Sequence, residues 1–168
     1  MKTLRFLAVL ILFVTCLPVI HSQTVTEKAK AIDYEALAQK LVNQCAGVKE
    51  GEVVLITGGV KDIELLENIA VNVSKIGAFP LISVGSDRLT RRLFTEVPEK
   101  YDSRIPLLDM KLLDFTNVII GVSYGEDPGL LADIPPARIA AMSNASVQLN
   151  DLAVKRNIRG VNLGNGLY

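Results

Sequence analysis

Apolar and polar positions alternate between two spacings along the chain. From Tyr34 to Cys45, apolar side chains recur at intervals of three and four residues, which predicts an amphipathic helix. Asp33 is placed to cap this helix and Gly47 to end it. Residues 53–56 then form a short, continuously apolar run, which is typical of a strand buried on both faces of a parallel sheet.

This pairing of helical spacing with an apolar run recurs to the end of the chain. Further strands are expected at residues 79–84, within 114–122 (the run Val-Ile-Ile-Gly-Val) and at 158–163. Further helices are expected from Asp62 to Gly77, from Ser86 or Asp87 to Val97-Pro98, and after Pro135-Pro136. Strands that alternate with helices predict right-handed βαβ crossovers and therefore an α/β fold.

We expect a Rossmann-like three-layer domain with a mostly parallel sheet of about four strands. The last predicted strand runs into the glycine-rich turn Gly164-Asn165-Gly166. Such a turn normally leads to another helix or strand. We therefore expect this domain to be incomplete at its C-terminus.

The first 22 residues have the pattern of a secretory signal peptide. Met1 to Arg5 carries two positive charges and no acid, and Phe6 to Ile20 is apolar apart from Thr15. This run is shorter than the roughly 20 residues that span a bilayer. We expect a signal peptide at 1–22, a flexible lead-in at 23–33 and an α/β domain at 34–168. Export to the periplasm or secretion follows, with no membrane attachment after cleavage; a lipid or membrane anchor is the alternative.

Removal of the signal segment changes the charge and the cysteine content. Loss of Lys2 and Arg5 leaves 16 basic residues against 18 acidic ones. A nucleic-acid partner would require a stripe of basic residues, and nothing in the sequence indicates one. Cys16 also leaves, and a single remaining cysteine cannot form an internal disulfide. Cys45 lies on the apolar stripe of the first predicted helix, so we expect it to be a buried packing residue.

Small and polar residues follow each predicted strand. In an open α/β sheet, ligands bind beyond the carboxyl ends of the strands, so these residues are candidates to line a cleft. The same residue types are typical of ordinary βα turns, and both interpretations remain open. The Gly58-Gly59 turn has neither the dinucleotide-binding nor the P-loop spacing, which argues against a nucleotide site. The candidate cleft residues are Gly58, Gly59, Ser86, Asp87, Ser123, Tyr124 and Asn165.

The histidine content excludes several kinds of catalytic site. The only histidine, His21, lies in the signal segment, so the exported chain has no imidazole for a Ser-His-Asp or Cys-His site. A zinc site without histidine and with one cysteine would need mostly carboxylates, which is rare. We therefore assign no catalytic residue and no metal ligand to this chain.

Three stretches resemble a known family. They are YEALAQKLVNQCAGVKEGEVVLITGG at 34–59, KIGAFPLISV at 75–84 and NVIIGVSYGEDPGLLADIPPARIAAMSNA at 117–145. Their order and turns resemble the N-terminal domain of the thermophilic metalloaminopeptidases, the aminopeptidase T or leucyl aminopeptidase type. The resemblance covers about residues 34–168 and rests on structural turns.

The resemblance implies a two-domain hydrolase that removes N-terminal amino acids from peptides and assembles as a homodimer. Such enzymes use two divalent metal ions (zinc, cobalt, manganese or magnesium) bound by Glu, His and Asp of the C-terminal domain. No position here matches those ligands, so we expect no metal on this chain and no activity from it alone. The signal peptide is a departure, since typical members are intracellular.

Two hypotheses follow. In the first, this chain is the non-catalytic, cleft-flanking N-terminal portion of an exported metal-dependent aminopeptidase. In the second, it is a stand-alone secreted α/β binding protein without catalytic activity.

Overall fold

The structure, a computed structural model, describes residues 32–122, 125 and 127–164. These residues belong to one unit of the chain, Ile32–Tyr168. The expected signal peptide at 1–22 and most of the expected lead-in at 23–33 lie outside the described residues. Three of the candidate cleft residues, Ser123, Tyr124 and Asn165, also lie outside them.

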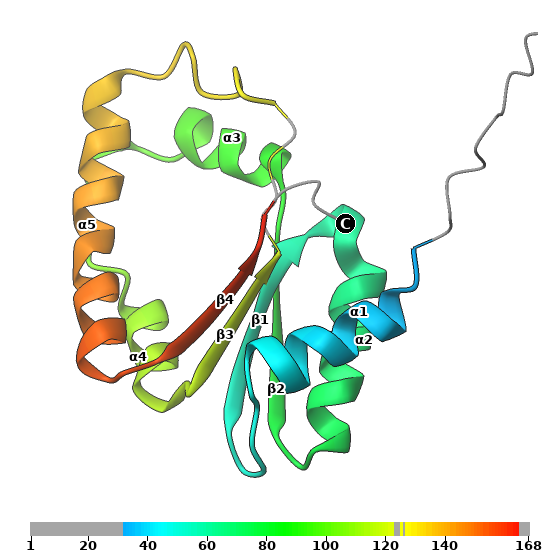
Figure 1. The fold of residues 1–168 in the computed structure, drawn as a ribbon. Coiled ribbons are helices and arrows are strands. Elements are labelled where there is room, and N and C mark those ends of the chain that lie inside the picture. The colour runs from blue at the N-terminus through cyan, green and yellow to red at the C-terminus, as the bar shows by residue number, and fades with distance from the viewer. Residues whose placement is uncertain (1–31, 123–124, 126, 165–168) are drawn as a thin grey trace, which may run out of the picture. The chain divides into compact units, whose positions relative to one another are not determined.

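A four-stranded parallel sheet forms the centre of this unit (Figure 1). Its strands, in the spatial order β2-β1-β3-β4, are β1 (Val53–Gly59), β2 (Phe79–Gly85), β3 (Val118–Val122) and β4 (Arg159–Leu163). β1 pairs with β2 along its whole length, from Val53 opposite Phe79 to Gly59 opposite Gly85. On its other side it pairs with β3. The predicted parallel α/β fold is therefore confirmed.

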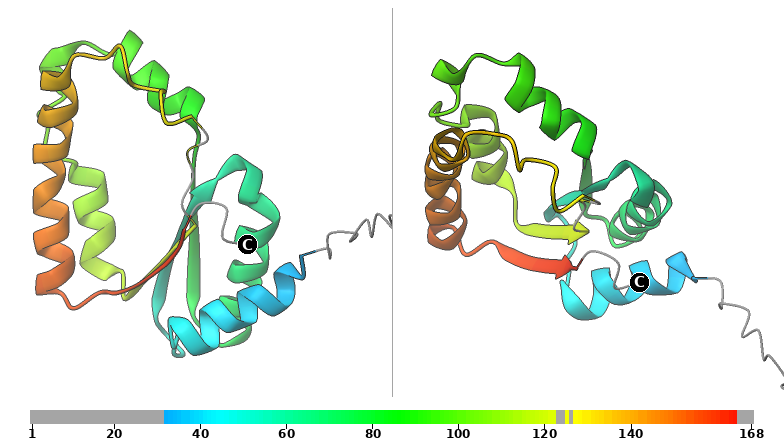
Figure 2. Two further views of the ribbon diagram at one scale, coloured as in Figure 1. Left: turned by 45° about the horizontal axis from the view of Figure 1, so that its top comes forward. Right: turned by 90° about the horizontal axis from the view of Figure 1, so that it is seen from above.

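Helices cover both faces of the sheet (Figures 1 and 2). The helical elements are α1 (Tyr34–Gln39), the π-helical turn η1 (Lys40–Cys45), the 3₁₀ turn η2 (Val60–Asp62), α2 (Ile63–Lys75), α3 (Asp87–Glu96), the 3₁₀ turn η3 (Glu99–Tyr101), α4 (Leu107–Phe115) and α5 (Pro136–Lys155). The crossover from β1 to β2 runs in one direction along the sheet, and the crossovers to β3 and β4 run in the other. Because right-handed crossovers in opposite directions place their helices on opposite faces, α2 lies on one face and α4 and α5 on the other. The helix α1, which precedes β1, packs beside α2.

The two faces of the sheet are packed unequally. On the α1/α2 face, alternate residues of β1 and β3 such as Ile56 and Ile120 are fully buried and belong to one hydrophobic core. On the other face, Leu55 and Ile119 are only partly buried, and none of the residues of α5, all of which are described, is buried. A cavity of about 260 Å³ separates these two strands from α4 and α5. The core that fixes β1 therefore lies mainly under α1 and α2.

Cys45 is exposed, so the expectation that it packs in the core is wrong. The reason is the π-helical turn that ends the first helix. There the amide of Ala46 donates to the carbonyl oxygen of Leu41 at 2.8 Å, five residues earlier instead of four. The additional residue in the turn rotates Cys45 off the apolar stripe, and Ala46 takes the buried position.

Truncation of the core should destabilise the chain far more than the same truncation on the surface. Leu66 of α2 is 0% exposed, whereas Leu108 of α4 is 72% exposed. We expect Leu66→Ala to lower the free energy of unfolding by about 2–5 kcal/mol, because it leaves a cavity against the sheet. Leu108→Ala should change it by about 0.5 kcal/mol or less. Urea denaturation measures both values, and equal losses would contradict the unequal packing described above.

Candidate functional site

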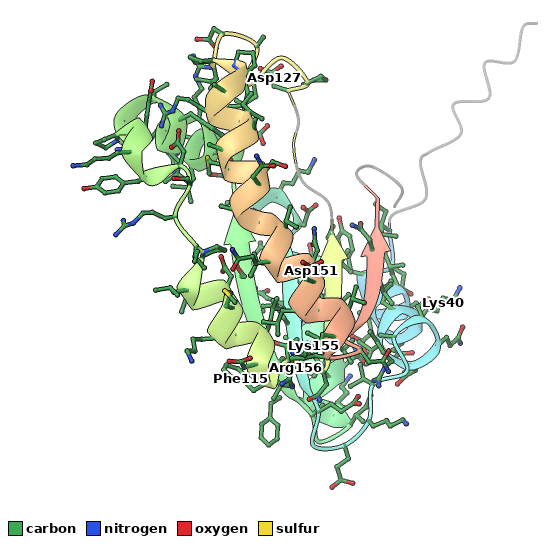
Figure 3. All side chains as sticks on the ribbon, turned by 90° about the vertical axis from the view of Figure 1, so that its left-hand side faces the viewer. Lys40, Phe115, Asp127, Asp151, Lys155 and Arg156 are labelled. Carbon is green, nitrogen blue, oxygen red and sulfur yellow. The ribbon has the colours of Figure 1, made fainter. Side chains whose placement is uncertain are left out.

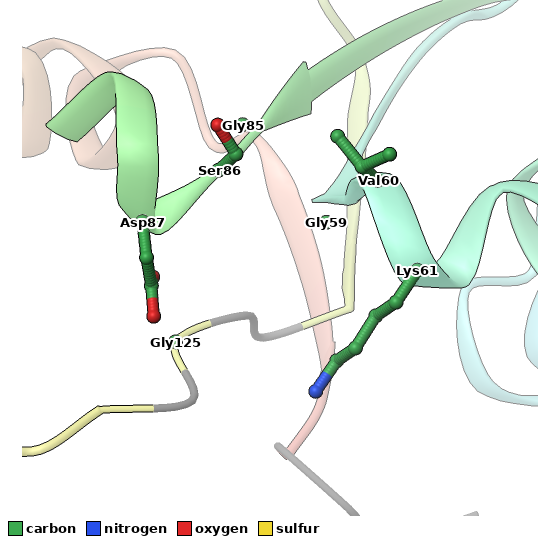
Figure 4. Close-up of a pocket in the computed structure, with 7 residues that line it drawn as sticks. All are labelled: Gly59, Val60, Lys61, Gly85, Ser86, Asp87 and Gly125. Atoms are coloured by element: carbon green, nitrogen blue, oxygen red, sulfur yellow. The ribbon is translucent and has the colours of Figure 1, made fainter.

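A pocket of about 140 Å³ opens at the carboxyl ends of β1 and β2 (Figure 4). The strand order reverses at the neighbouring β1–β3 pair, and such a point is where open α/β sheets commonly bind ligands. The residues that line the pocket follow three strands: Gly59, Val60 and Lys61 at β1, Gly85, Ser86 and Asp87 at β2, and Gly125 after β3.

The wall after β1 is held by a buried carboxylate. Asp62 is 4% exposed, and its Oδ2 accepts a hydrogen bond from the amide of Gly59 at 3.1 Å. The sequence predicts that α2 begins at Asp62, a residue type that commonly caps helices. It occupies the N-cap position, but its side chain makes no capping bond to that helix and turns back to Gly59 instead. Asp62 thus fixes the turn that carries Lys61.

The wall after β2 is the first turn of α3. The Ser86 hydroxyl oxygen accepts a hydrogen bond from the amide of Leu89 at 3.2 Å and so caps the helix. The sequence left open whether this helix starts at Ser86 or at Asp87. Asp87 Oδ2 accepts from the amide of Asp127 at 3.3 Å. Gly125 adopts a φ of 121°, which favours glycine, and a Cβ there would lie 3.9 Å from Asp87 Oδ1. Asp87 therefore joins the end of β2 to the segment that follows β3.

Among the described residues that line the pocket, one side chain is basic and one is acidic. Figure 4 shows the Lys61 ammonium and the Asp87 carboxylate reaching from opposite walls toward the space beside Gly125. Three of the lining residues are glycines, so backbone forms much of the surface. The arrangement places a cationic and an anionic residue at the ends of two neighbouring strands.

The structure brings some of the candidate residues together. Gly59, Ser86 and Asp87 line the same pocket. Gly58 lies next to it but faces α2, where an added Cβ would come within 2.8 Å of Leu66 Cδ2, so this glycine permits close packing of helix and strand. Gly85 and Gly125 belong to the turns expected after the second and third strands, although they are not among the seven candidates. Sequence reasoning missed Val60 and Lys61, and the signal that could have identified them is that they directly follow the candidate Gly59.

The described residues do not fit a metal centre. Among residues 32–122, 125 and 127–164, no group of three or more His, Cys, Asp and Glu side chains is placed to hold a metal ion. A catalytic zinc needs about three protein ligands. Among the described residues of the pocket wall, Asp87 is the one that carries a carboxylate.

Two ion pairs hold α3, and with it Asp87, in place. Arg138 of α5 binds Asp102 through Nε–Oδ2 (2.6 Å) and Nη2–Oδ1 (2.8 Å), with side chains 10% and 7% exposed. Its Nη2 also donates to the carbonyl of Val97, just past α3, at 3.0 Å. These bonds from Arg138 lower the pKa of Asp102.

The second ion pair ties α3 to the segment before α5. Arg91 of α3 forms a bidentate pair with Asp133 and donates to the carbonyl of Leu130 at 2.8 Å. The hydrogen bonds from Arg91 lower the pKa of Asp133 to about 2. Together the two arginines fix both flanks of α3.

Comparison with known proteins gives a family match and a structural match. The sequence profile of the family described as thermophilic metalloprotease (M29) matches residues 31–162. Among solved structures, the chain is similar to wild-type AmpT from Thermus thermophilus, with a TM-score of 0.64 and 18% sequence identity; the match covers 78% of this chain and 35% of that chain. This likeness shows a shared fold, and this chain spans well under half of the length of AmpT. None of the curated proteins compared with the chain matches it.

The Asp102 pair should make stability depend on acidic pH. Because the folded-state pKa of Asp102 lies below its ordinary value of about 3.9, its contribution is present above that value and is lost as pH falls through the folded pKa. We expect Asp102→Asn to be less stable at pH 7 and to lose less stability between pH 5 and pH 2 than the unaltered chain. Asp151→Asn, at an exposed carboxylate, is the control. Urea denaturation at each pH measures the free energy of unfolding. If this free energy changed with pH equally in Asp102→Asn and in the unaltered chain, the result would contradict this role of Asp102.

Removal of the Asp62 carboxylate should loosen the wall that carries Lys61. In Asp62→Ala, the buried amide of Gly59 loses its acceptor, at a cost of about 1–3 kcal/mol in the free energy of unfolding. Asp62→Asn retains an acceptor oxygen and should cost clearly less. Chemical denaturation of the two variants measures the difference. Equal losses would show that the bond to Gly59 does not stabilise the turn.

Proposed function

The chain belongs to the thermophilic metalloprotease (M29) family, and from this membership we propose that it is the cleft-flanking N-terminal portion of an exported, metal-dependent aminopeptidase. The observation that carries the proposal is the family match over residues 31–162. The resemblance seen in the sequence is thereby confirmed for the family. The proposed reaction is hydrolysis of the N-terminal residue of a peptide.

In this proposal the catalytic metals are bound outside this chain. A metal-bound water would attack the scissile carbonyl while the ions polarise it, and the ions need clustered Glu, His and Asp ligands. The described residues offer no such cluster. Two divalent ions (zinc, cobalt, manganese or magnesium) would therefore belong to the complete enzyme, of which this chain supplies one wall of the substrate cleft.

The carboxyl edge of the sheet is the part of this chain that we assign to the cleft. Parallel strands end there in a pocket whose walls are fixed by Asp62 on one side and by Ser86 on the other. Fixed walls reduce the entropy lost when a substrate is positioned. Lys61 and Asp87 would supply polar contacts to the peptide.

Export and assembly complete the proposal. Export is supported by the charged start and the apolar run of residues 6–20. In the part of the chain that the structure describes, no helix has the length and apolar character to cross a membrane. For the complete enzyme we propose a homodimer, on the basis of the family resemblance.

A second candidate function is a stand-alone exported binding protein of the same fold. The observation that favours it is a pocket with a charged residue on each wall and without a metal cluster among the described residues. The two functions differ in whether the coding DNA continues. An open frame with clustered Glu and His codons beyond Tyr168 supports the aminopeptidase, and a stop codon there supports the binding protein.

We expect the purified chain to be inactive as a peptidase. Incubation of the chain with zinc, cobalt, manganese or magnesium and leucyl-p-nitroanilide should release nitroaniline no faster than the metal alone. The physical reason is the absence of a described ligand cluster that could activate water. A metal-dependent leucyl aminopeptidase assayed in parallel is the positive control. Turnover that chelation abolishes would overturn the assignment of catalysis to a region outside this chain.

A further inference from the structure

The cavity between the sheet and its second helical layer has the features of a ligand site. β1 and β3 form one wall of this space of about 260 Å³, and α4 and α5 form the other; Figure 3 views the molecule from the side of these helices. The cavity shares no described lining residue with the pocket at the strand ends. We propose that it binds a small aliphatic amine in its cationic form, with the hydrocarbon chain inside and the ammonium group at Asp109 and Asn150.

The interior of the cavity is apolar. Leu113 of α4 is 7% exposed, and the other aliphatic lining residues are half-buried. Water is retained in a cavity only where about two to four polar groups hold it, so this wall holds water weakly. Transfer of a hydrocarbon chain from solvent to the wall is therefore favourable. The aliphatic residues among the described lining are Leu55, Leu112, Leu113, Ile119, Leu149 and Ala153.

The mouth of the cavity carries the two polar residues of the described lining. Asp109 of α4 and Asn150 of α5 are both exposed, and within the described part of the chain neither side chain makes a hydrogen bond or an ion pair. The carboxylate of Asp109 and the amide oxygen of Asn150 accept hydrogen bonds. An ammonium group has three donors, no acceptor and a charge opposite to that of Asp109. A ligand carboxylate would meet Asp109 as a like charge.

Contacts at both ends of α5 hold this helix at its distance from the strands. Near the start of α5, Arg138 makes its buried ion pair with Asp102. Just past its end, the amide of Ile158 donates to the carbonyl of Ala153 at 3.0 Å, in the turn that leads into β4. Collapse of α5 onto the strands would strain these contacts. A ligand that fills the cavity instead supplies the van der Waals contacts that its lining lacks.

The volume of the cavity limits the length of the ligand. An apolar protein cavity of about 150 Å³ is large enough to bind benzene. Drug-sized ligands need pockets of roughly 300 Å³ or more. A cavity of about 260 Å³ lies between these two sizes and suits a chain of about six carbon atoms. Hexylamine, which is a cation at pH 7, is therefore the probe for this site.

Calorimetric titration of the full chain at pH 7 tests the proposal with probes of equal chain length. Hexylammonium is a cation, 1-hexanol is neutral and hexanoate is an anion. We expect saturable binding of hexylammonium, at least tenfold weaker binding of 1-hexanol and still weaker binding of hexanoate. Propylammonium should also bind at least tenfold more weakly than hexylammonium, because it buries three methylene groups fewer. The readout is binding alone, so it is independent of the peptidase assay.

Three variants assign the contacts. Asp109→Asn removes the charge at the mouth and should weaken hexylammonium binding at least tenfold, to the level of 1-hexanol. Asp114→Asn removes the same charge from the same helix outside the cavity lining and should leave binding unchanged. Ala153→Met extends a side chain into the cavity and should weaken hexylammonium and 1-hexanol alike, with the helical circular dichroism of the chain intact.

Three results would overturn the inference. The first is the absence of saturable hexylammonium binding by the unaltered chain with its helical circular dichroism intact. The second is equal binding of hexylammonium and 1-hexanol, since a purely apolar cavity would not distinguish them by charge. The third is equal weakening by Asp109→Asn and Asp114→Asn, because that effect would come from the net charge of the surface and not from a contact at the mouth.

Discussion

The rest of the structure depends on β1, which is hydrogen-bonded to a parallel strand on each side. A strand in that position must be extended over its whole length and compatible with burial on both faces, which explains the unbroken apolar run at its start. Asn117 sets the position of β1 relative to β3. The side-chain Oδ1 of Asn117 accepts a hydrogen bond from the backbone amide of Val53 at 2.8 Å, and the backbone amide of Asn117 donates to the carbonyl of Val53 at 2.9 Å. β1 and β2 pair residue for residue from Val53 opposite Phe79 to Gly59 opposite Gly85, so the two strands end together. The pocket is the space where they end.

Charged side chains secure the periphery that the core does not reach. Arg159 at the start of β4 binds Glu52, just before β1, at 2.6 Å and donates to the carbonyls of Ala46 and Gly47 at 3.3 Å. The bond from Arg159 lowers the pKa of Glu52. Arg138 does the equivalent away from the strands, where it joins the first part of α5 to the residues that directly follow α3 and η3. Bidentate and multiple contacts of this kind fix orientation well, even where their net contribution to stability is small.

Much of the fold followed from the sequence, because strand burial and helix spacing are local properties. The four predicted strands agree with the observed ones to within three residues at each end, and β1 extends through Gly59 because β2 pairs with it that far. The helix α4 was not predicted, since Leu107 and Leu108 are exposed and blur its apolar stripe. Cys45 was misplaced by an additional residue in a turn. For the site, the rule that ligands bind beyond the carboxyl ends of parallel strands identified Gly59, Ser86 and Asp87. That Lys61 and Asp87 line one pocket depends on which strands are neighbours, and the Arg138–Asp102 pair joins residues 36 apart, so local spacing reveals neither.

The π-helical turn at Lys40–Cys45 also has a meaning for comparing sequences. It holds one residue more than an α-helical turn and absorbs that residue inside the helix, so that Ala46 and Val48 still reach the core before β1 begins. A relative with an uninterrupted α-helix would enter β1 in the same register with one residue fewer. When such sequences are aligned, the single-residue gap therefore belongs between Lys40 and Cys45, within the helix, and not in the glycine-containing loop that follows.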